Sequence, residues 1–154
     1  MKTFQALLNE TLQHVKEIFP WDLQEIITSG QPFLLDVREP YEFEKFHIKN
    51  SINVPRGILE TACEYGFEDT VPELVQARDK EVIVICRSGN RSVFAAHTMQ
   101  LMGYQSVFSL KTGVRGWNDY ELPLYNLQHQ LVEMEEIDKM LNHPLRPDQL
   151  PPKN

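Results

Sequence analysis

The chain has 154 residues, of which 42% are hydrophobic and 24% charged. These values predict one folded domain with flanking segments and exclude a wholly disordered chain. The formal net charge of −7 leaves no basic footprint for nucleic acid and disfavours anionic membrane surfaces. Two cysteines, Cys63 and Cys86, are too few for a disulfide scaffold, and no cysteine–histidine spacing suggests a metal site. We expect reduced thiols, a cytoplasmic protein, and neither metal nor cofactor.

The first 19 residues carry apolar side chains at helical spacing, from Phe4 to Ile18. This pattern predicts an amphipathic helix that ends before Pro20. Polar residues such as Asn9 and Lys16 interrupt the apolar run, so it resembles neither a signal peptide nor a membrane span. We therefore expect residues 1–19 to form an N-terminal helix outside the main domain.

From Pro20 onward, predicted strands and helices alternate. Strands are predicted at residues 32–37, 51–55, 81–86 and 106–110, and helices at 21–28, 39–46 and 91–102. Residues 56–79 read as mostly helical with breaks, and residues 112–120 as a loop running into a helix. Such alternation predicts an α/β fold with three layers and a central parallel sheet of about five strands.

After Leu124 the pattern changes again. A second amphipathic stripe predicts a helix with a docking face, and its members are Leu127, Leu131, Met134, Ile137 and Leu141. Residues 143–154 are rich in proline and predict an extended tail. The predicted organisation is thus a helix at 1–19, a domain at 20–124, and a helix with a tail at 125–154.

The segment VIVICRSGNRSVFAA, residues 82–96, places Cys86 where a buried strand ends and a helix begins near Arg91. Ligands bind beyond the carboxyl ends of parallel strands, and helix N-termini attract anions. We expect the thiolate form of Cys86 to be favoured there. The groups predicted to contact a bound anion are Arg87, Ser88, Gly89, Asn90, Arg91 and Ser92. A buried structural cysteine and solvated surface arginines are the alternative interpretation.

Three segments resemble motifs of the rhodanese family of sulfurtransferases, in the order the family shows. They are CRSGNRS at residues 86–92, LLDVREPYEFEKFHIKNSINVP at 34–55, and GVRGW at 113–117. The resemblance extends from about Pro20 to Leu124. It implies that Cys86 is the catalytic cysteine and that the amides of residues 87–91 cradle the transferred sulfur. It also implies that thiosulfate loads Cys86 with a persulfide, and that a thiol or cyanide takes the sulfur away.

The resemblance further implies that Arg87 and Arg91 hold the anionic donor. Four residues separate Cys86 from Arg91, the sulfurtransferase length, whereas phosphatases of this fold have five. A phosphatase or arsenate reductase is therefore disfavoured, and the retained cysteine and arginines argue against a silent regulatory module. A persulfide carrier in a protein-to-protein relay stays open, as do a protein acceptor and self-association through the terminal helices.

Several neighbouring residues are better explained by structure than by chemistry. By resemblance, Asp36 and Arg38 tie a strand end to the next helix, and His47 makes a structural hydrogen bond. Cys63 is expected to pack as a small apolar side chain, with a resolving role toward Cys86 as the alternative. The family's downstream motif usually begins with two adjacent glycines, whereas Gly113 and Gly116 are separated here. The sequence leaves open whether Arg115, between them, faces the active site.

Overall fold

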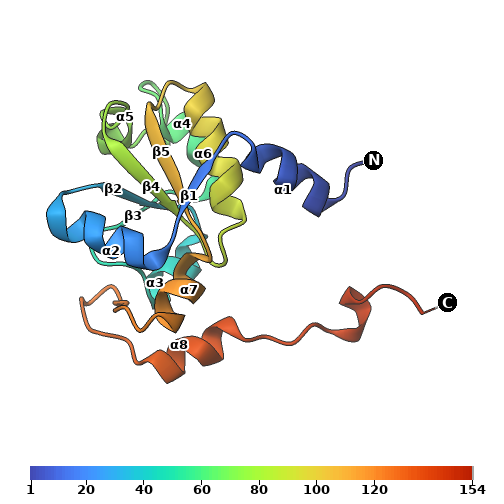
Figure 1. Ribbon diagram of the computed structural model, residues 1–154. Helices are drawn as coiled ribbons and strands as arrows, with labels where there is room; N and C mark the ends of the chain where they lie inside the picture. Colours follow the sequence, from blue (N-terminus) through green and yellow to red (C-terminus); the bar gives the residue numbers. More distant parts are fainter. Residues whose placement is uncertain (154) are drawn as a thin grey trace.

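The computed structural model describes residues 1–153 and contains one five-stranded sheet in which every neighbouring pair is parallel (Figure 1). The strand order is β1-β5-β4-β2-β3. The strands are β1 (Lys16–Ile18), β2 (Phe33–Asp36), β3 (Ile52–Asn53), β4 (Glu81–Ile85) and β5 (Ser106–Leu110). The helices are α1 (Phe4–Leu12), α2 (Pro20–Ser29), α3 (Pro40–Lys45), α4 (Leu59–Ala62), α5 (Pro72–Val75), α6 (Arg91–Leu101), α7 (Gly113–Asp119) and α8 (Met134–Leu141).

Both faces of the sheet are covered, which confirms the predicted three layers. Along β4, Val82 and Val84 face one apolar cluster, whereas Ile83 and Ile85 face another. This alternation is the period of a strand buried on both sides. Helices α1, α4, α5 and α6 contribute to the first cluster, and α2, α7 and α8 contribute to the second. None of the helices in residues 1–153 combines the length and apolar character needed to cross a membrane.

The N-terminal prediction is partly wrong. Helix α1 ends at Leu12, and Lys16–Ile18 is the edge strand β1, paired with β5. Val15 and Ile18 fit helical spacing, but the pairing with β5 satisfies the backbone groups of this segment and buries Val15 in the core. Strand β1 thus completes the expected number of five strands, but the sequence pattern predicted the positions of only the other four.

The predicted stripe at 127–141 is helical only in its second half, because α8 begins at Met134. Before it, the side-chain Oδ1 of Asn126 accepts hydrogen bonds from the backbone N–H groups of Gln128 and Gln130 and closes a turn. Leu127 and Leu131 are consequently exposed. Residues 56–79 are likewise less helical than predicted, with a 3₁₀ turn at Arg56–Ile58 and the short helices α4 and α5.

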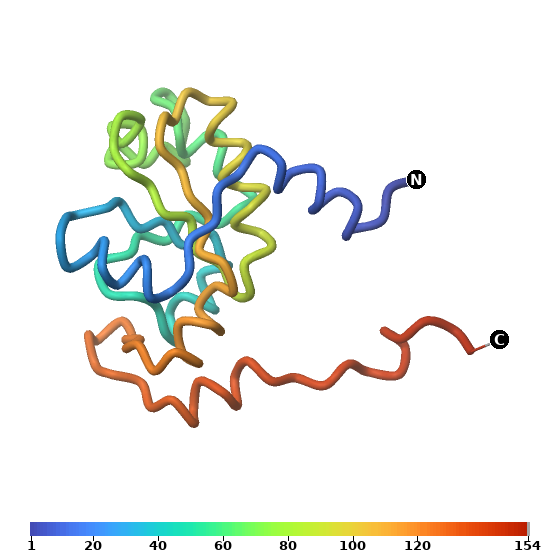
Figure 2. Tube along the Cα trace, viewed as in Figure 1, coloured from blue at the N-terminus to red at the C-terminus, as the bar shows by residue number. Residues whose placement is uncertain are grey.

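The C-terminal tail after α8 is extended apart from a 3₁₀ turn at Pro147–Gln149, in agreement with the prediction. In Figure 2 the tail runs away from the sheet, toward the side on which the N-terminus also lies. Its apolar residues Leu145 and Leu150 are exposed. The division of the chain near residues 19 and 124 stays a prediction, as does self-association through the terminal segments.

Candidate active site

Cys86 directly follows β4, a central strand of the sheet, and lies at its carboxyl end. The loop of residues 87–90 leads from there into α6, which begins at Arg91 as the sequence predicted. The Cys86 side chain points to the sheet face that α6 covers, and the residue is only 1% exposed. The site is therefore built on rigid elements, because a buried strand and a buried helix hold the two ends of the loop.

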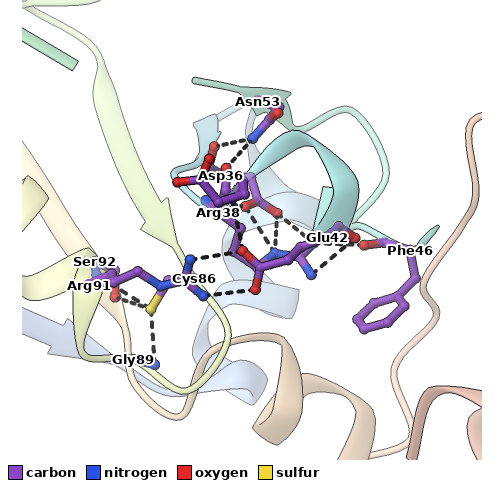
Figure 3. Close-up of polar contacts among 10 residues, drawn as sticks. Asp36, Arg38, Glu42, Phe46, Asn53, Cys86, Gly89, Arg91 and Ser92 are labelled. Carbon is purple, nitrogen blue, oxygen red and sulfur yellow. Dashed lines mark hydrogen bonds and ion pairs between the residues drawn. The ribbon is translucent and has the colours of Figure 1, made fainter. Parts of the chain in front are cut away.

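The Cys86 sulfur receives hydrogen bonds from its own loop. The backbone N–H of Gly89 donates to Sγ over 3.1 Å, and that of Ser92 over 3.4 Å (Figure 3). The Ser92 hydroxyl oxygen lies 3.2 Å from Sγ and 2.7 Å from the Ser109 hydroxyl of β5. Backbone donors aimed at a sulfur stabilise it when it carries negative charge. This geometry suits a thiolate or a persulfide at residue 86.

Glycine is required at two places around this loop. Gly89 has φ +92°, and a Cβ there would lie 2.8 Å from the backbone nitrogen of Thr112. At Gly113 a Cβ would lie 2.4 Å from the carbonyl oxygen of Cys86. The start of α7 thus packs directly against the loop, and the N–H of Val114 donates to that same carbonyl over 2.9 Å.

Thr112 and Gly113 both have positive φ, +69° and +60°. They lie next to each other where β5 leads into α7, which begins at Gly113. A β-branched residue in this conformation is strained. Glycine at position 112 would adopt this conformation without such strain.

Arg91 is held by Glu42 of α3. Its Nη1 and Nη2 donate to the two carboxylate oxygens over 2.9 and 3.0 Å (Figure 3). Burial raises the pKa of Glu42, but the hydrogen bonds from Arg91 and from the Glu39 backbone outweigh it, and the net pKa lies below the usual 4.5. The hydrogen bonds to Glu42 in turn raise the pKa of Arg91. Arg91 therefore links α6 to α3.

Asp36 and Arg38 form a buried clamp beneath this pair, as the resemblance implied. Arg38 Nη2 donates to Asp36 Oδ2 over 2.9 Å and to the Phe46 carbonyl over 2.7 Å, and both charged side chains are almost fully buried. The side-chain amide of Asn53 donates to the carbonyls of Asp36 and Arg38. These contacts tie the carboxyl end of β2 to the end of α3 and to β3.

The expectation of a structural His47 also holds. Its Nδ1 lies 2.8 Å from the Phe43 carbonyl, and its ring stacks on that of Phe43. Burial lowers the pKa of His47. Cys63 is fully buried beside α4, as expected for a packing residue, and burial raises the pKa of its thiol. A resolving role for Cys63 stays the untested alternative.

Arg87 differs from Arg91 in its partner. Its Nη2 donates to the backbone carbonyl of Leu141 at the end of α8. Beside it lies a cavity of about 210 Å³ lined by Arg38, Tyr41, Glu42, Lys45, Phe46, Arg87, Met140, Leu141 and His143. Ser88 and Asn90 are exposed on the loop, whereas Ser92 is fully buried against the sulfur. The structure thus separates the predicted binding residues into those that surround Cys86 and those that face solvent.

Sequence reasoning missed the functional contacts of Glu42, Ser109 and Leu141. Each lies far along the chain from its partner, and Glu42 is separated from Arg91 by 49 positions. Glu42 carried one signal, its place on a helix inside the segment that resembles the upstream rhodanese motif. Ser109 carried a weaker one, as one of two serines in a strand whose other three residues are apolar. In residues 1–153 no group of three or more potential ligand side chains could hold a metal ion.

A parallel sheet that presents a cysteine in a loop of backbone amides at the end of a central strand defines a class of cysteine-dependent group-transfer domains. The model of the rhodanese-like domain family matches residues 20–120. The chain belongs to that family.

Two relatives and one solved structure illustrate its range. The chain is 37% identical over 84 residues to the "Putative sulfur carrier protein YrkF" of Bacillus subtilis, covering 54% of this chain and 40% of that protein. It is 35% identical over 95 residues to the "Putative thiosulfate sulfurtransferase, mitochondrial" of Schizosaccharomyces pombe, covering 56% and 63%. Its alignment thus spans less than two thirds of the length of either relative.

The solved structure is that of RPA3614 from Rhodopseudomonas palustris, described as a protein of unknown function and "Possible Tyrosine Phosphatase". It matches with a TM-score of 0.74 and 28% identity, covering 80% of this chain and 95% of that one. Both sequence relatives are named for the handling of sulfur, one as a carrier and one as a sulfurtransferase.

Proposed function

We propose that this protein is a thiosulfate sulfurtransferase that carries sulfur as a persulfide on Cys86. The Cys86 thiolate attacks the outer sulfur of thiosulfate, the S–S bond of thiosulfate breaks, and sulfite leaves with the bonding electron pair. A thiol or cyanide then attacks the terminal sulfur of the persulfide. The bond between the two sulfurs breaks, and Cys86 returns to the thiolate.

The observation that carries this proposal is the pair of backbone N–H groups that converge on Sγ, from Gly89 in the four-residue loop and from Ser92 in the first turn of α6. A phosphatase must surround three phosphoryl oxygens, which needs a wider ring of donors. A loop one residue shorter suits a single sulfur atom. Support for thiosulfate comes from Arg87 and Lys45, two cations that line the cavity beside the loop.

A second candidate is a persulfide carrier that receives sulfur from one protein and delivers it to another. The name of the YrkF relative favours it. Steady-state kinetics separate the two candidates, since an enzyme turns over free thiosulfate rapidly, whereas a carrier is loaded far faster by a protein donor. The two free cysteines suit a reducing cytoplasm in either case.

Intact mass spectrometry tests the proposal. Incubation of the reduced protein with thiosulfate is expected to add the mass of one sulfur atom, and cyanide or a thiol to remove it. Cys86→Ser should abolish the adduct, and Cys63→Ser, which alters the other buried cysteine, should retain it. If Cys86→Ser still gains the sulfur and Cys63→Ser does not, the sulfur is carried by Cys63, and the assignment of the active site to Cys86 is refuted.

A further inference from the structure

One wall of the cavity beside Arg87 comes from the end of α8, which lies beyond the residues 20–120 that match the family. We propose that Arg115, acting through the Leu141 carbonyl, positions the Arg87 guanidinium to bind a small oxyanion. This inference rests on the proposed function and adds to it a positioning residue for the donor. Arg115 does not line the cavity, so it acts through Arg87.

Arg115 contacts both the backbone of Arg87 and the carbonyl to which the Arg87 guanidinium donates. Its backbone N–H donates to the Arg87 carbonyl over 3.0 Å. Its Nη2 donates to the Leu141 carbonyl over 2.7 Å, and its Nη1 to Asn142 Oδ1 over 2.8 Å. One residue of α7 therefore fixes both the backbone from which Arg87 projects and the carbonyl that Arg87 contacts.

The Leu141 carbonyl is a firm anchor because α8 is packed into the core. Ile137 and Leu141 are 1% and 4% exposed and belong to the apolar cluster beneath the sheet. A carbonyl oxygen has two lone pairs, which allows it to accept from Arg87 and Arg115 together. Two cationic side chains at a helix C-terminus also complement the partial negative charge there.

The arrangement leaves Arg87 able to bind a ligand. Within residues 1–153 its Nη2 has the Leu141 carbonyl as partner, and no hydrogen bond engages Nε or Nη1. A guanidinium tethered at one end loses less rotational freedom when an anion binds at the other. The cavity is also lined by Lys45 and by the apolar Met140 and Leu141, and it measures about 210 Å³. We therefore assign it to a small oxyanion such as thiosulfate.

Calorimetry with thiosulfate on the Cys86→Ser protein tests the inference, because binding is then measured without turnover. Adding Arg115→Ala should raise the Kd for thiosulfate about tenfold, through loss of the tether on Arg87. In the protein that retains Cys86, Arg115→Ala should raise the KM for thiosulfate similarly and change kcat by no more than about twofold. Arg115→Lys, which keeps one donor, should give an intermediate Kd. Arg146→Ala is the matched control, because Arg146 is exposed in the tail and pairs with Asp148.

A double-mutant cycle distinguishes positioning from a general structural role. In an Arg87→Ala background, Arg115→Ala should produce no further loss of thiosulfate affinity, because its effect passes through Arg87. Additive losses, an unchanged Kd in both Arg115 variants, or no binding of thiosulfate to Cys86→Ser would each overturn the inference. If Arg115→Ala unfolds, Arg115→Lys decides by the same criteria. Binding that depends on Arg115 without sulfur loading at Cys86 would support this inference and refute the proposed function.

Discussion

Glu42 of α3 and Arg91 of α6 form a bidentate ion pair, with N–O distances of 2.9 and 3.0 Å. The pair joins the helix that follows β2 to the helix that follows the Cys86 loop. A second carboxylate contact fixes Glu42, since Oε2 also accepts the Glu39 backbone N–H over 2.9 Å. The resemblance had implied that both arginines hold the donor. The geometry favours a division in which Arg91 holds the loop and Arg87 meets the ligand.

Arg87→Ala and Arg91→Ala should therefore impair different steps, the first the binding of thiosulfate and the second the stability of the persulfide. Arg87→Ala is expected to raise the KM for thiosulfate by about tenfold or more while the persulfide, once formed, keeps its lifetime. Arg91→Ala leaves Glu42 partly buried without its partner, so the loop should be disturbed and the persulfide should decay faster. Donor kinetics together with the persulfide lifetime by mass spectrometry measure the two effects. Equal damage to both quantities in each variant would contradict the division.

Stability should depend on pH through Glu42. Its pKa is lower in the folded chain than the usual 4.5, so its ion pair stabilises the fold above about pH 4.5 and is lost as pH falls through the lowered value. Glu42→Gln should lower the free energy of unfolding by about 1 kcal/mol at pH 7. The difference from the unaltered protein should shrink toward pH 3. Urea unfolding at both pH values measures it, and Glu44→Gln, an exposed change on the same helix, is the control.

Thr112→Gly should stabilise the protein. The φ of +69° strains a β-branched residue, and glycine relieves that strain at some cost in backbone entropy. We expect a net gain of about 0.5–1 kcal/mol in the free energy of unfolding. Gly113→Ala, the control at the next residue, should destabilise the protein and impair sulfur loading, because its Cβ meets the Cys86 carbonyl. A less stable Thr112→Gly protein would show that the threonine side chain contributes more than its backbone strain removes.

Aryl phosphates should not be appreciably hydrolysed, although the similar RPA3614 is described as a "Possible Tyrosine Phosphatase". The short loop brings the backbone N–H of Gly89 to within 3.1 Å of Sγ, and the N–H of Ser92 lies 3.4 Å away. Insertion of one glycine beside Gly89 should widen the ring, weaken sulfur transfer and admit phosphate or arsenate as a weak ligand. Parallel assays with thiosulfate and an aryl phosphate measure both activities. Faster hydrolysis of the phosphate ester by the unaltered protein would refute the sulfurtransferase proposal.

Local patterns were enough to predict the core of the fold and the position of Cys86. Residues 82–85 of β4 are all β-branched and apolar, a pattern that predicts a buried strand without knowledge of the rest of the fold. The helix after the loop begins at Arg91, as predicted. Strand β1 was missed because three residues give too little periodicity, and its pairing partner lies at Phe108–Leu110. The contacts of Glu42 and Leu141 were missed for a related reason. Each depends on where distant helices meet, which spacing along the chain does not encode.

The hydroxyls of Ser92 and Ser109 form a short chain of hydrogen bonds behind the Cys86 sulfur, and this chain can run in either direction. When Cys86 is a thiol, its S–H can donate to Ser92 Oγ, and Ser92 can donate to Ser109. When the sulfur is charged, the Ser92 hydroxyl turns to donate to it, and Ser109 donates in turn to Ser92. Loss of the proton thus reverses the direction of two buried hydrogen bonds through rotation of the two hydroxyl groups. The hydroxyl that accepts from the thiol is therefore the same group that donates to the sulfur anion.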